Sequence, residues 1–423
     1  MRNKTDYLYI GMDVHKEVHT AVLMTYMEER VGEIEISNNL NGFKRLTAYV
    51  QKCQEKKNLT YLTPLYGLED VTHYGRNLAI YLLDKEHPVK EVNSALSYLE
   101  RMSYPTTKKN DMWDAQCICA VLMRRYENLP DADPKDYYWV MKQLVHRRNA
   151  LVRTKSALLQ QFHEQIQYDY PSYKKFFHEV ECNTSVAFFE QYPSGQTLED
   201  TTVEELAEFL RIPSHNACST KRAQQILSLI EEDAVKVHDY QFGRDFIIQS
   251  MMRNIRFILD ELERIDKLQK QLLKEVDYHL ETIPGVNTVT ASALVGQIGD
   301  ISRFKSADKL ANYAGVAPIC FSSGGKGKNV QNKNQGNREL YSVLYLLAMQ
   351  QIHVNTKGQA RNPVLRAYFE SKVSSGKTKI QALLCIMRRL VNIIYSMMKN
   401  QTVYRMPELK EPELAEEKEQ MIS

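Results

Sequence analysis

The apolar residues near the start of the chain fall into short runs divided by polar breaks. Residues 7–12 and 20–25 form apolar runs, and residues 31–36 alternate between apolar and polar. Short runs with a period of two are typical of β-strands, so this pattern predicts a meander of three strands. Helical spacing at residues 41–53 precedes a fourth strand-like stretch at residues 59–68.

Strands and helices continue to alternate up to about residue 125. We expect a helix at residues 77–83, a short strand at residues 89–92 and a further helix at residues 111–126. Alternation of this kind predicts an α/β domain.

The pattern becomes almost wholly helical between residues 135 and 280. Within this region, residues 246–280 carry apolar side chains at intervals of three and four between charges, which predicts a long helix. That helix is either a coiled-coil arm or an ordinary packed helix. After Ile283-Pro284-Gly285 the chain is richer in glycine, asparagine and small residues, and helical spacing returns at residues 363–400.

These changes predict a fold that is α/β plus mostly α, in four segments. An N-terminal domain at residues 1–165 precedes a helical linker and coiled-coil arm at residues 166–280. A C-terminal helical domain that contains a serine motif is expected at residues 281–405, and a glutamate-rich, disordered tail at residues 406–423.

Composition narrows the class of protein. Hydrophobic residues make up 43% of the 423 residues, enough for a large core, yet no segment approaches the roughly 18 consecutive apolar residues of a membrane span. The polar start lacks the apolar stretch of a signal peptide, so we expect a cytoplasmic protein without membrane contact. Seven scattered cysteines with no Cys-x-x-Cys pair indicate neither a disulfide framework nor a zinc ribbon.

The net charge is only +3, but the basic residues are unevenly distributed. Residues 141–155 contain five lysines and arginines and no acid, whereas residues 408–419 contain six glutamates. Clustered cations can neutralise nucleic-acid phosphates, although a charge run can equally be a solvated face. Arg147, Arg148 and Arg153 are therefore candidate contacts to nucleic acid.

Four carboxylates stand where an α/β domain presents functional groups. Asp13 ends the first strand, Glu69 follows the fourth, and Asp111 and Asp114 begin a helix. A spacing of three puts Asp111 and Asp114 on one face of a helix turn, where like charges repel unless a cation lies between them. Hard oxygen ligands of this kind suit Mg²⁺, and two Mg²⁺ ions can assist an in-line phosphoryl transfer.

Each acid also has an ordinary structural interpretation. Asp13 could cap a turn, and either Glu69 or its neighbour Asp70 could be a surface acid. Asp111 could be a helix N-cap, with Asp114 favoured by the helix dipole. The combination of the four acids, in this order on this strand pattern, favours the metal site.

A serine beside two glycines lies near residue 323. In Ser322-Ser323-Gly324-Gly325 the glycines would leave a hydroxyl exposed and let a phosphate approach the backbone closely. Positive charge for that phosphate would come from Lys326, Lys328, Lys333 and Arg338. The same residues are also common in flexible linkers, and no Ser-His-Asp arrangement lies nearby to activate the serine.

Four blocks of residues, spread over residues 7–350, carry a likeness to a known family. They are Tyr9-Ile10-Gly11-Met12-Asp13-Val14-His15-Lys16, Gly67-Leu68-Glu69 with Tyr74, Lys108-Lys109-Asn110-Asp111-Met112-Trp113-Asp114-Ala115, and the stretch from Ile283-Pro284-Gly285 to Gly336-Asn337-Arg338. The last block includes Ala311-Asn312-Tyr313-Ala314-Gly315-Val316-Ala317-Pro318 and the serine segment. In this order the blocks resemble the insertion-sequence transposases numbered one hundred and ten and the related Piv-type DNA invertases.

The resemblance implies an N-terminal RNase H-like (RuvC-like) domain, whose four acids map to Asp13, Glu69, Asp111 and Asp114. It implies that Ser323, with Ser322 as the rival, attacks a DNA phosphate and forms a covalent phosphoserine link. Mg²⁺ on the acids would assist from a partner subunit, and strand exchange and rejoining would follow. The resemblance also implies a structured noncoding guide RNA that base-pairs with target and donor DNA.

Two departures from the family pattern bear on these assignments. After Glu69 the family usually has a threonine and a glycine, where this chain has Val71 and Thr72, so Asp70 becomes an alternative ligand. After the serine, a usual Ile-Ser-Lys stretch is replaced by Asn332-Lys333-Asn334.

Other functions share parts of this pattern. Sugar kinases and actin-like ATPases also begin with a strand, a glycine and an aspartate, but the later glycine-rich phosphate loops that they need are not found. A RuvC-like junction nuclease, a DNA invertase without RNA guidance and a non-enzymatic nucleic-acid-binding protein are the alternatives. A homo-oligomer, a dimer or tetramer, is expected because each cut needs acids and serine brought together.

Overall fold

The computed structural model describes residues 3–70, 73–104, 110–132, 134, 136–323, 326–331 and 336–407. The chain divides into two compact units. One unit combines the residues up to Lys142 with those from Val276 onward, and the other is Gln143–Glu275. Most of the predicted acidic tail, residues 408–423, lies outside the described residues.

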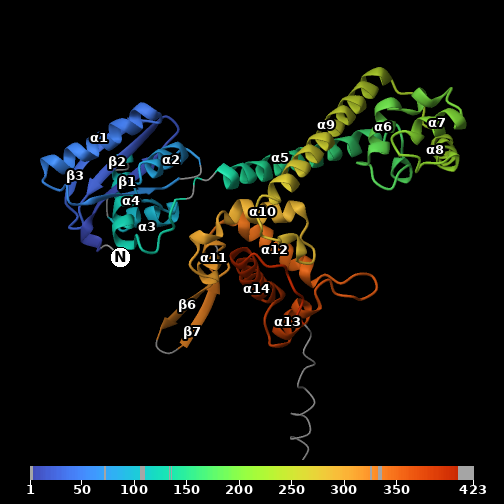
Figure 1. The fold of residues 1–423 in the computed structure, drawn as a ribbon. Helices are drawn as coiled ribbons and strands as arrows, with labels where there is room; N and C mark the ends of the chain where they lie inside the picture. Colours follow the sequence, from blue (N-terminus) through green and yellow to red (C-terminus); the bar gives the residue numbers. More distant parts are fainter. Residues whose placement is uncertain are drawn as a thin grey trace, which may run out of the picture. The chain divides into compact units, whose positions relative to one another are not determined.

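The first unit begins, after a short 3₁₀ helix at Lys4–Asp6, with a mixed five-stranded sheet. Its strands are β1 (Tyr7–Val14), β2 (Val18–Met24), β3 (Arg30–Ser37), β4 (Thr63–Leu68) and β5 (Val89–Glu91). They lie in the order β3-β2-β1-β4-β5 (Figure 1). Because β1 pairs antiparallel with β2 and β2 with β3, the predicted meander is confirmed. β4 and β5 add parallel strands on the other side of β1.

The fourth strand begins later than the apolar pattern predicts. The residues before Thr63 form a turn rather than a strand, because the buried amide of Gln54 holds their carbonyls. Its Nε2 donates to Leu59 O at 3.2 Å and to Leu62 O at 2.7 Å. A side chain from the preceding helix therefore sets the start of β4.

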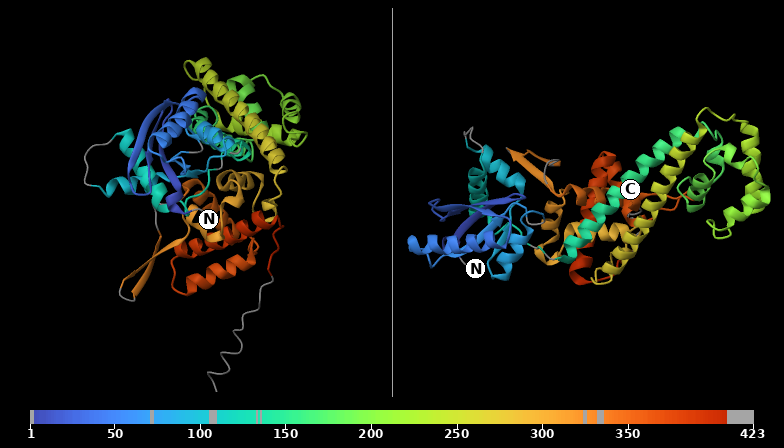
Figure 2. Two further views of the ribbon diagram at one scale, coloured as in Figure 1. Left: turned by 60° about the vertical axis from the view of Figure 1, so that its left-hand side comes forward. Right: turned by 90° about the horizontal axis from the view of Figure 1, so that it is seen from above.

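Helices cover both faces of the sheet (Figure 2). α1 (Leu40–Lys56) and α2 (Arg76–Asp84) pack on one face, where they form a core with alternate residues of β1. α4 (Asp111–Arg125) packs on the other face against Tyr9 and its neighbours. α3 (Ser94–Met102), which the sequence pattern does not predict, packs beside α4.

The alternation along β1 decides which of its residues meet α4. Leu8, Ile10 and Met12 lie in the core under α1 and α2, whereas Tyr9 lies in the core under α4. α4 approaches Gly11 so closely that a Cβ there would lie 2.3 Å from Ala115 O. Since successive side chains of a strand point to opposite faces, Asp13 shares the α4 face with Tyr9 and Gly11.

The second unit is helical (Figure 1). It contains most of α5 (Asp136–Ile166), then α6 (Asn183–Gln191), α7 (Val203–Arg211), α8 (Thr220–Asp233) and α9 (Gln241–Leu273), with short 3₁₀ helices at Tyr173–Lys175 and Gly195–Leu198. Its core is rich in aromatic rings, including Phe162, Tyr170, Phe176, Phe188 and Phe189.

α9 runs antiparallel to α5, and the two are joined by an apolar cluster of Leu151, Ile258, Leu262 and Ile265. The long helix predicted at residues 246–280 is therefore present, but it begins and ends earlier than predicted. The last predicted turns are absent because residues from Val276 belong to the other unit, and His279 has a positive φ of 47° that a right-handed helix excludes.

The C-terminal part of the first unit combines helices with a hairpin. Its elements are α10 (Thr288–Ile298), α11 (Ala307–Tyr313), β6 (Pro318–Ser323), β7 (Lys326–Gln331), α12 (Arg338–Ile352), α13 (Pro363–Ser374) and α14 (Lys379–Asn400), with 3₁₀ helices at Leu280–Thr282 and Ile301–Arg303. Ser322 and Ser323 lie on a strand of the hairpin, so the alternative interpretation of these two residues as part of a flexible linker is wrong. Ser322 pairs with Gly327 and Ser323 with Lys326, because the strands bring their backbones into an antiparallel ladder.

α14 passes a length and composition test for a membrane-spanning helix, the only one to do so among the described residues. Within the protein it packs against α11, α12 and α13. Its buried face includes Ile386, Leu390 and Ile394, each with 0% of its surface exposed. The apolar residues of α14 therefore serve as the core of the C-terminal part.

Candidate active site

The sheet brings the first two predicted acids to one edge. β1 and β4 are neighbouring parallel strands, and Met12 pairs with Leu68 in their register. The next residue on each strand is therefore an acid, Asp13 on β1 and Glu69 directly after β4. Parallel neighbours end at the same edge of a sheet, so these two carboxylates lie side by side.

The first turn of α4 supplies the other two acids. Asn110 is the N-cap, and its Oδ1 accepts a hydrogen bond from Trp113 N at 2.8 Å. The alternative interpretation of Asp111 as the N-cap is therefore wrong, and Asp111 is the first helical residue. Asp111 is exposed, whereas Asp114, one turn later, is buried against the sheet.

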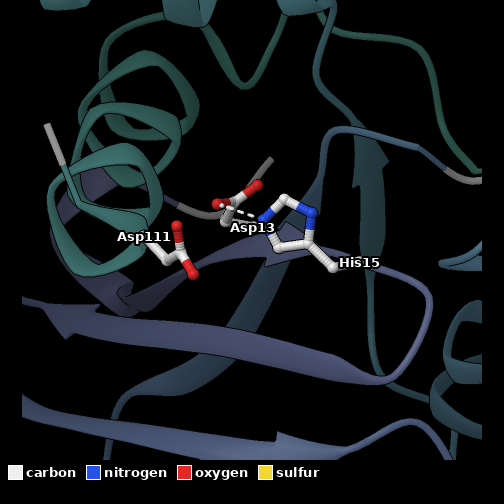
Figure 3. Close-up of side chains that lie close together, drawn as sticks. All are labelled: Asp13, His15 and Asp111. Atoms are coloured by element: carbon white, nitrogen blue, oxygen red, sulfur yellow. Dashed lines mark hydrogen bonds and ion pairs between the residues drawn. The ribbon is translucent and has the colours of Figure 1, made fainter.

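His15 joins this group, although the sequence analysis does not include it. One ligand atom each from Asp13, His15 and Asp111 lie within 4.8 Å of one another (Figure 3). His15 Nε2 is 3.1 Å from Asp13 Oδ2. The signal for His15 was present in the sequence, since it follows Asp13 by two residues, directly after the end of β1.

Two side chains from α3 hold the remaining acids. Arg101 Nη1 lies 2.9 Å from Asp114 Oδ2, and Ser97 Oγ donates to Glu69 Oε2 at 3.1 Å. The other oxygen of Asp114, Oδ1, is buried and has no hydrogen-bond partner among the described residues. Sequence analysis missed Arg101 and Ser97 because it did not predict their helix.

The acids raise one another's proton affinity. Burial raises the pKa of the Asp13 carboxyl above its usual range, His15 opposes that rise, and the charges of Asp114 and Asp111 add to it. Burial also raises the pKa of Glu69. The hydrogen bond from Ser97 opposes this rise, and the charge of Asp13 adds to it. The site thus concentrates negative charge in a partly buried place.

These residues fit a divalent cation. The unpartnered Oδ1 of Asp114 is a buried acceptor that a cation would satisfy, and neighbouring carboxylates of like charge need one to stay ionised together. The separation of up to 4.8 Å between ligand atoms is close to the distance of about 4.2 Å between two oxygens on opposite sides of a small cation. Carboxylate oxygens are the ligands that hard divalent cations prefer.

Asp70, the alternative ligand, has a different role in the structure. It accepts hydrogen bonds from His73 N at 3.0 Å and Tyr74 N at 3.2 Å, so its carboxylate caps the turn after β4. The cluster of potential metal ligands in the described residues contains neither Asp70 nor the predicted ligands Glu69 and Asp114. Val71 and Thr72, where the family pattern is broken, lie outside the described residues.

Two family models match separate parts of the chain. A model described as "Transposase", of the DEDD type, matches residues 10–171, and the model "Transposase IS116/IS110/IS902 family" matches residues 277–365. Together the matches cover more than half of the 423 residues. The chain belongs to the IS116/IS110/IS902 transposase family. It is thus a DNA transposase or recombinase.

Curated relatives of this transposase match most of its length. An uncharacterized 44.8 kDa protein of insertion element IS116 from Streptomyces clavuligerus is 23% identical over 96% of this chain and 98% of its own. A pilin gene-inverting protein from Moraxella lacunata is 25% identical over 92% of this chain and 95% of its own. A transposase of insertion sequence IS1111A from Coxiella burnetii is 22% identical over 71% of this chain and 70% of its own.

The two matched ranges separate the predicted site residues of this transposase. The four acids lie in the first range, and Ser322, Ser323 and Arg338 lie in the second. Arg338 is exposed in the first turn of α12, and Lys326 and Lys328 lie on β7. Lys333 lies outside the described residues.

The predicted basic contacts on α5 are of two kinds. Arg147 and Arg153 are exposed. Arg148 instead donates to both carboxylate oxygens of Asp266 on α9, from Nε at 2.6 Å and from Nη2 at 3.2 Å. Because a bidentate pair fixes the guanidinium, Arg148 is less available to a phosphate than its neighbours.

Proposed function

We propose that this transposase cuts, exchanges and rejoins DNA strands through a metal-assisted acidic site and a serine nucleophile. The observation that carries the proposal is the convergence of Asp13 and Asp111 in one cluster of potential metal ligands, with Glu69 and Asp114 near enough to interact electrostatically with Asp13, in a transposase-family chain. Asp13 and Asp114 are buried beside further carboxylates, which is unfavourable for acids that serve only solubility.

In this proposal the four acids hold Mg²⁺. Bound there, Mg²⁺ would supply positive charge that stabilises the oxygens of a DNA phosphate during transfer. Arg101 fixes one oxygen of Asp114 and Ser97 fixes Glu69, so two carboxylates are oriented before any ligand binds. That preorientation reduces the entropy that must be lost on binding.

We assign the acids to an RNase H-like (RuvC-like) domain at residues 1–165. An antiparallel meander that continues into parallel strands, with acids on β1, after β4 and on α4, supports this assignment. The helical arm at residues 166–280 and the serine domain at residues 281–405 complete the proposed division.

Ser323 is the proposed nucleophile, with Ser322 as the alternative. Its Oγ would attack the phosphorus of a DNA backbone phosphate and form a phosphoserine bond. The bond from phosphorus to one sugar oxygen would break, and the proton of the serine hydroxyl would be balanced by protonation of that leaving oxygen. Attack by a strand end on the phosphoserine would reverse these changes and rejoin the DNA.

Basic residues near the serine and on α5 are the proposed nucleic-acid contacts. Lys326, Lys328, Lys333 and Arg338 would neutralise phosphates at the cut, and Arg147 and Arg153 would contact DNA or RNA along the arm. The exposure of Arg147, Arg153 and Arg338 supports this assignment. Arg148 is the weaker candidate because Asp266 holds it.

The resemblance to RNA-guided insertion-sequence transposases extends the proposal to its partners. A structured noncoding RNA would choose the target and donor DNA by base pairing, and a dimer or tetramer would bring serine and acids from different subunits to one phosphate. We expect the transposase to act in the cytoplasm on cellular DNA.

The test uses full-length protein, Mg²⁺, the flanking noncoding RNA and labelled element-end DNA. Label that stays on the protein in a denaturing gel reports the phosphoserine bond. We expect it with the unmodified protein and with Ser322→Ala, but not with Ser323→Ala or Asp13→Ala. Omission of the RNA, with all else unchanged, tests guidance separately.

Other outcomes select other functions. Loss of label with Ser322→Ala but not with Ser323→Ala would move the nucleophile by one residue. Nicked DNA without any labelled protein would make the chain a RuvC-like hydrolytic nuclease. Label that forms equally well without RNA would favour a DNA invertase that needs no guide.

A further inference from the structure

His15 lies beside Asp13 and Asp111 in the acidic site. Its Nε2 lies 3.1 Å from Asp13 Oδ2, and one of its ring nitrogens lies within 4.8 Å of a carboxylate oxygen of Asp111 (Figure 3). The side chain is 55% exposed, so solvent and a dissolved cation can reach the ring. One imidazole nitrogen therefore faces two acids that come from different elements, β1 and α4.

The position of His15 is set by a buried partner rather than by a loose loop. Its backbone N donates to His19 Nδ1 at 3.3 Å, and His19 is completely buried. The His19 ring stacks on Phe43, with 6.2 Å between ring centroids and 6° between planes. The turn between β1 and β2 is thus fixed where it presents His15 to the acids.

We infer that His15 is a direct nitrogen ligand of the divalent cation at the acidic site, beside Asp13 and Asp111, and that it shifts the preference of the site from Mg²⁺ toward Mn²⁺. This inference rests on the proposed function, which places a cation on the acids. It adds a fifth residue, and a different donor atom, to the four predicted carboxylates.

The geometry favours direct binding over simple support of Asp13. A histidine that only oriented Asp13 would need one hydrogen bond, yet the ligand nitrogen also lies close to Asp111. Imidazole nitrogen is a softer donor than carboxylate oxygen, and affinities for nitrogen-containing sites rise along the transition series, whereas Mg²⁺ prefers oxygen. A nitrogen ligand therefore strengthens Mn²⁺ binding more than Mg²⁺ binding.

The test is pulsed electron paramagnetic resonance of Mn²⁺ bound to the full-length protein, with Mn²⁺ and Mg²⁺ affinities measured by titration calorimetry. We expect a coupling to directly bound ¹⁴N that disappears in His15→Gln. The same variant should weaken Mn²⁺ binding by about tenfold or more and Mg²⁺ binding by less.

His73→Gln is the matched control. His73 is 53% exposed, and its Nδ1 lies 3.1 Å from an aspartate oxygen, Asp70 Oδ1, outside the cluster of potential ligands. This variant should keep both the nitrogen coupling and the affinities. This result would show that the loss of a histidine paired with an aspartate does not by itself weaken metal binding.

The variant Asp13→Asn distinguishes a failure of the proposed metal site from a failure of ligation by His15. If Asp13→Asn binds Mn²⁺ as the unmodified protein does, the metal site of the proposed function is wrong. If Asp13→Asn abolishes binding but the unmodified protein shows no nitrogen coupling, or keeps it in His15→Gln, the site stands and direct ligation by His15 is overturned.

Discussion

Arg101 Nη1 lies 2.9 Å from Asp114 Oδ2, and this pair ties α3 to the first turn of α4. It leaves Asp114 half satisfied, with one oxygen on a guanidinium and the other buried without a hydrogen-bond partner among the residues that the structure describes. The arrangement balances one negative charge of the acidic site while keeping an acceptor for a ligand. Arg101 is therefore a positioning residue, and its removal should have effects on stability as well as on activity.

We expect Arg101→Met to lower the free energy of unfolding by about 2–3 kcal/mol, because a buried carboxylate loses its cation. Urea denaturation measures the change. In an Asp114→Asn background the same substitution should cost much less, since no charge is left unpaired. Equal losses in the two backgrounds would mean that the pair contributes nothing to stability.

The pKa shifts of Asp13 and Glu69 predict an unusual dependence of stability on pH. Both carboxyls have a higher pKa in the folded protein, so the folded state binds more protons than the unfolded state at mildly acid pH. The free energy of unfolding of the metal-free protein should therefore fall as pH rises from about 4, the ordinary carboxyl value, through the raised pKa values.

Two variations check this pH dependence. Asp13→Asn should flatten the fall and make the metal-free protein more stable at neutral pH, because one of the mutually repelling charges is gone. Added Mg²⁺ or Mn²⁺ should stabilise the unmodified protein at neutral pH but not Asp13→Asn, since only the intact folded site binds the cation. Thermal unfolding with and without metal gives both readings, and metal stabilisation that persists in Asp13→Asn would contradict them.

Gly11→Ala should destabilise the N-terminal domain by about 3 kcal/mol, at the upper end of overpacking effects. The new Cβ would meet backbone atoms of α4, Ala115 O at 2.3 Å and Cys119 N at 2.4 Å, which cannot rotate away. Gly243→Ala in α9 is the control, because a Cβ there meets nothing within 4 Å. That variant should be stabilised by up to about 1 kcal/mol through helix propensity. Comparable effects at the two glycines, measured by denaturation, would contradict the close approach of β1 and α4.

We expect Arg147 and Arg153 of α5 to contact nucleic acid, and Arg148 of α5 to stabilise the fold. The double variant Arg147→Gln, Arg153→Gln should reduce the slope of log affinity against log salt for DNA or guide RNA by about two, one for each phosphate that an arginine no longer neutralises. Arg148→Gln should leave the slope unchanged and instead lower thermal stability, because Asp266 loses its bidentate partner. Binding curves at several salt concentrations measure the slopes, and a reduced slope for Arg148→Gln would return that residue to the nucleic-acid contacts.

Local patterns in the sequence were enough for elements with an unbroken apolar run or with regular apolar spacing. β1 and β2 followed from their apolar runs, since nearly every residue of each is buried, and α4 followed from its apolar residues at helical spacing. α3 escaped prediction for a physical reason: Ser97 is its one buried residue, while Tyr98, Leu99 and Met102 are exposed. The apolar residues of α3 therefore do not lie on the face that is buried against the rest of the protein, and their spacing does not predict the helix.

The sequence by itself determined which acids could form a site, since the end of a strand and the first turn of a helix are local features that Asp13, Glu69 and Asp111 reveal. Tertiary structure decided the rest. The register of β1 with β4 and the close contact at Gly11 set how near the acids lie, and α3 brought Arg101 to Asp114. Distances between residues far apart in the chain depend on packing, which periodicity along one segment does not encode.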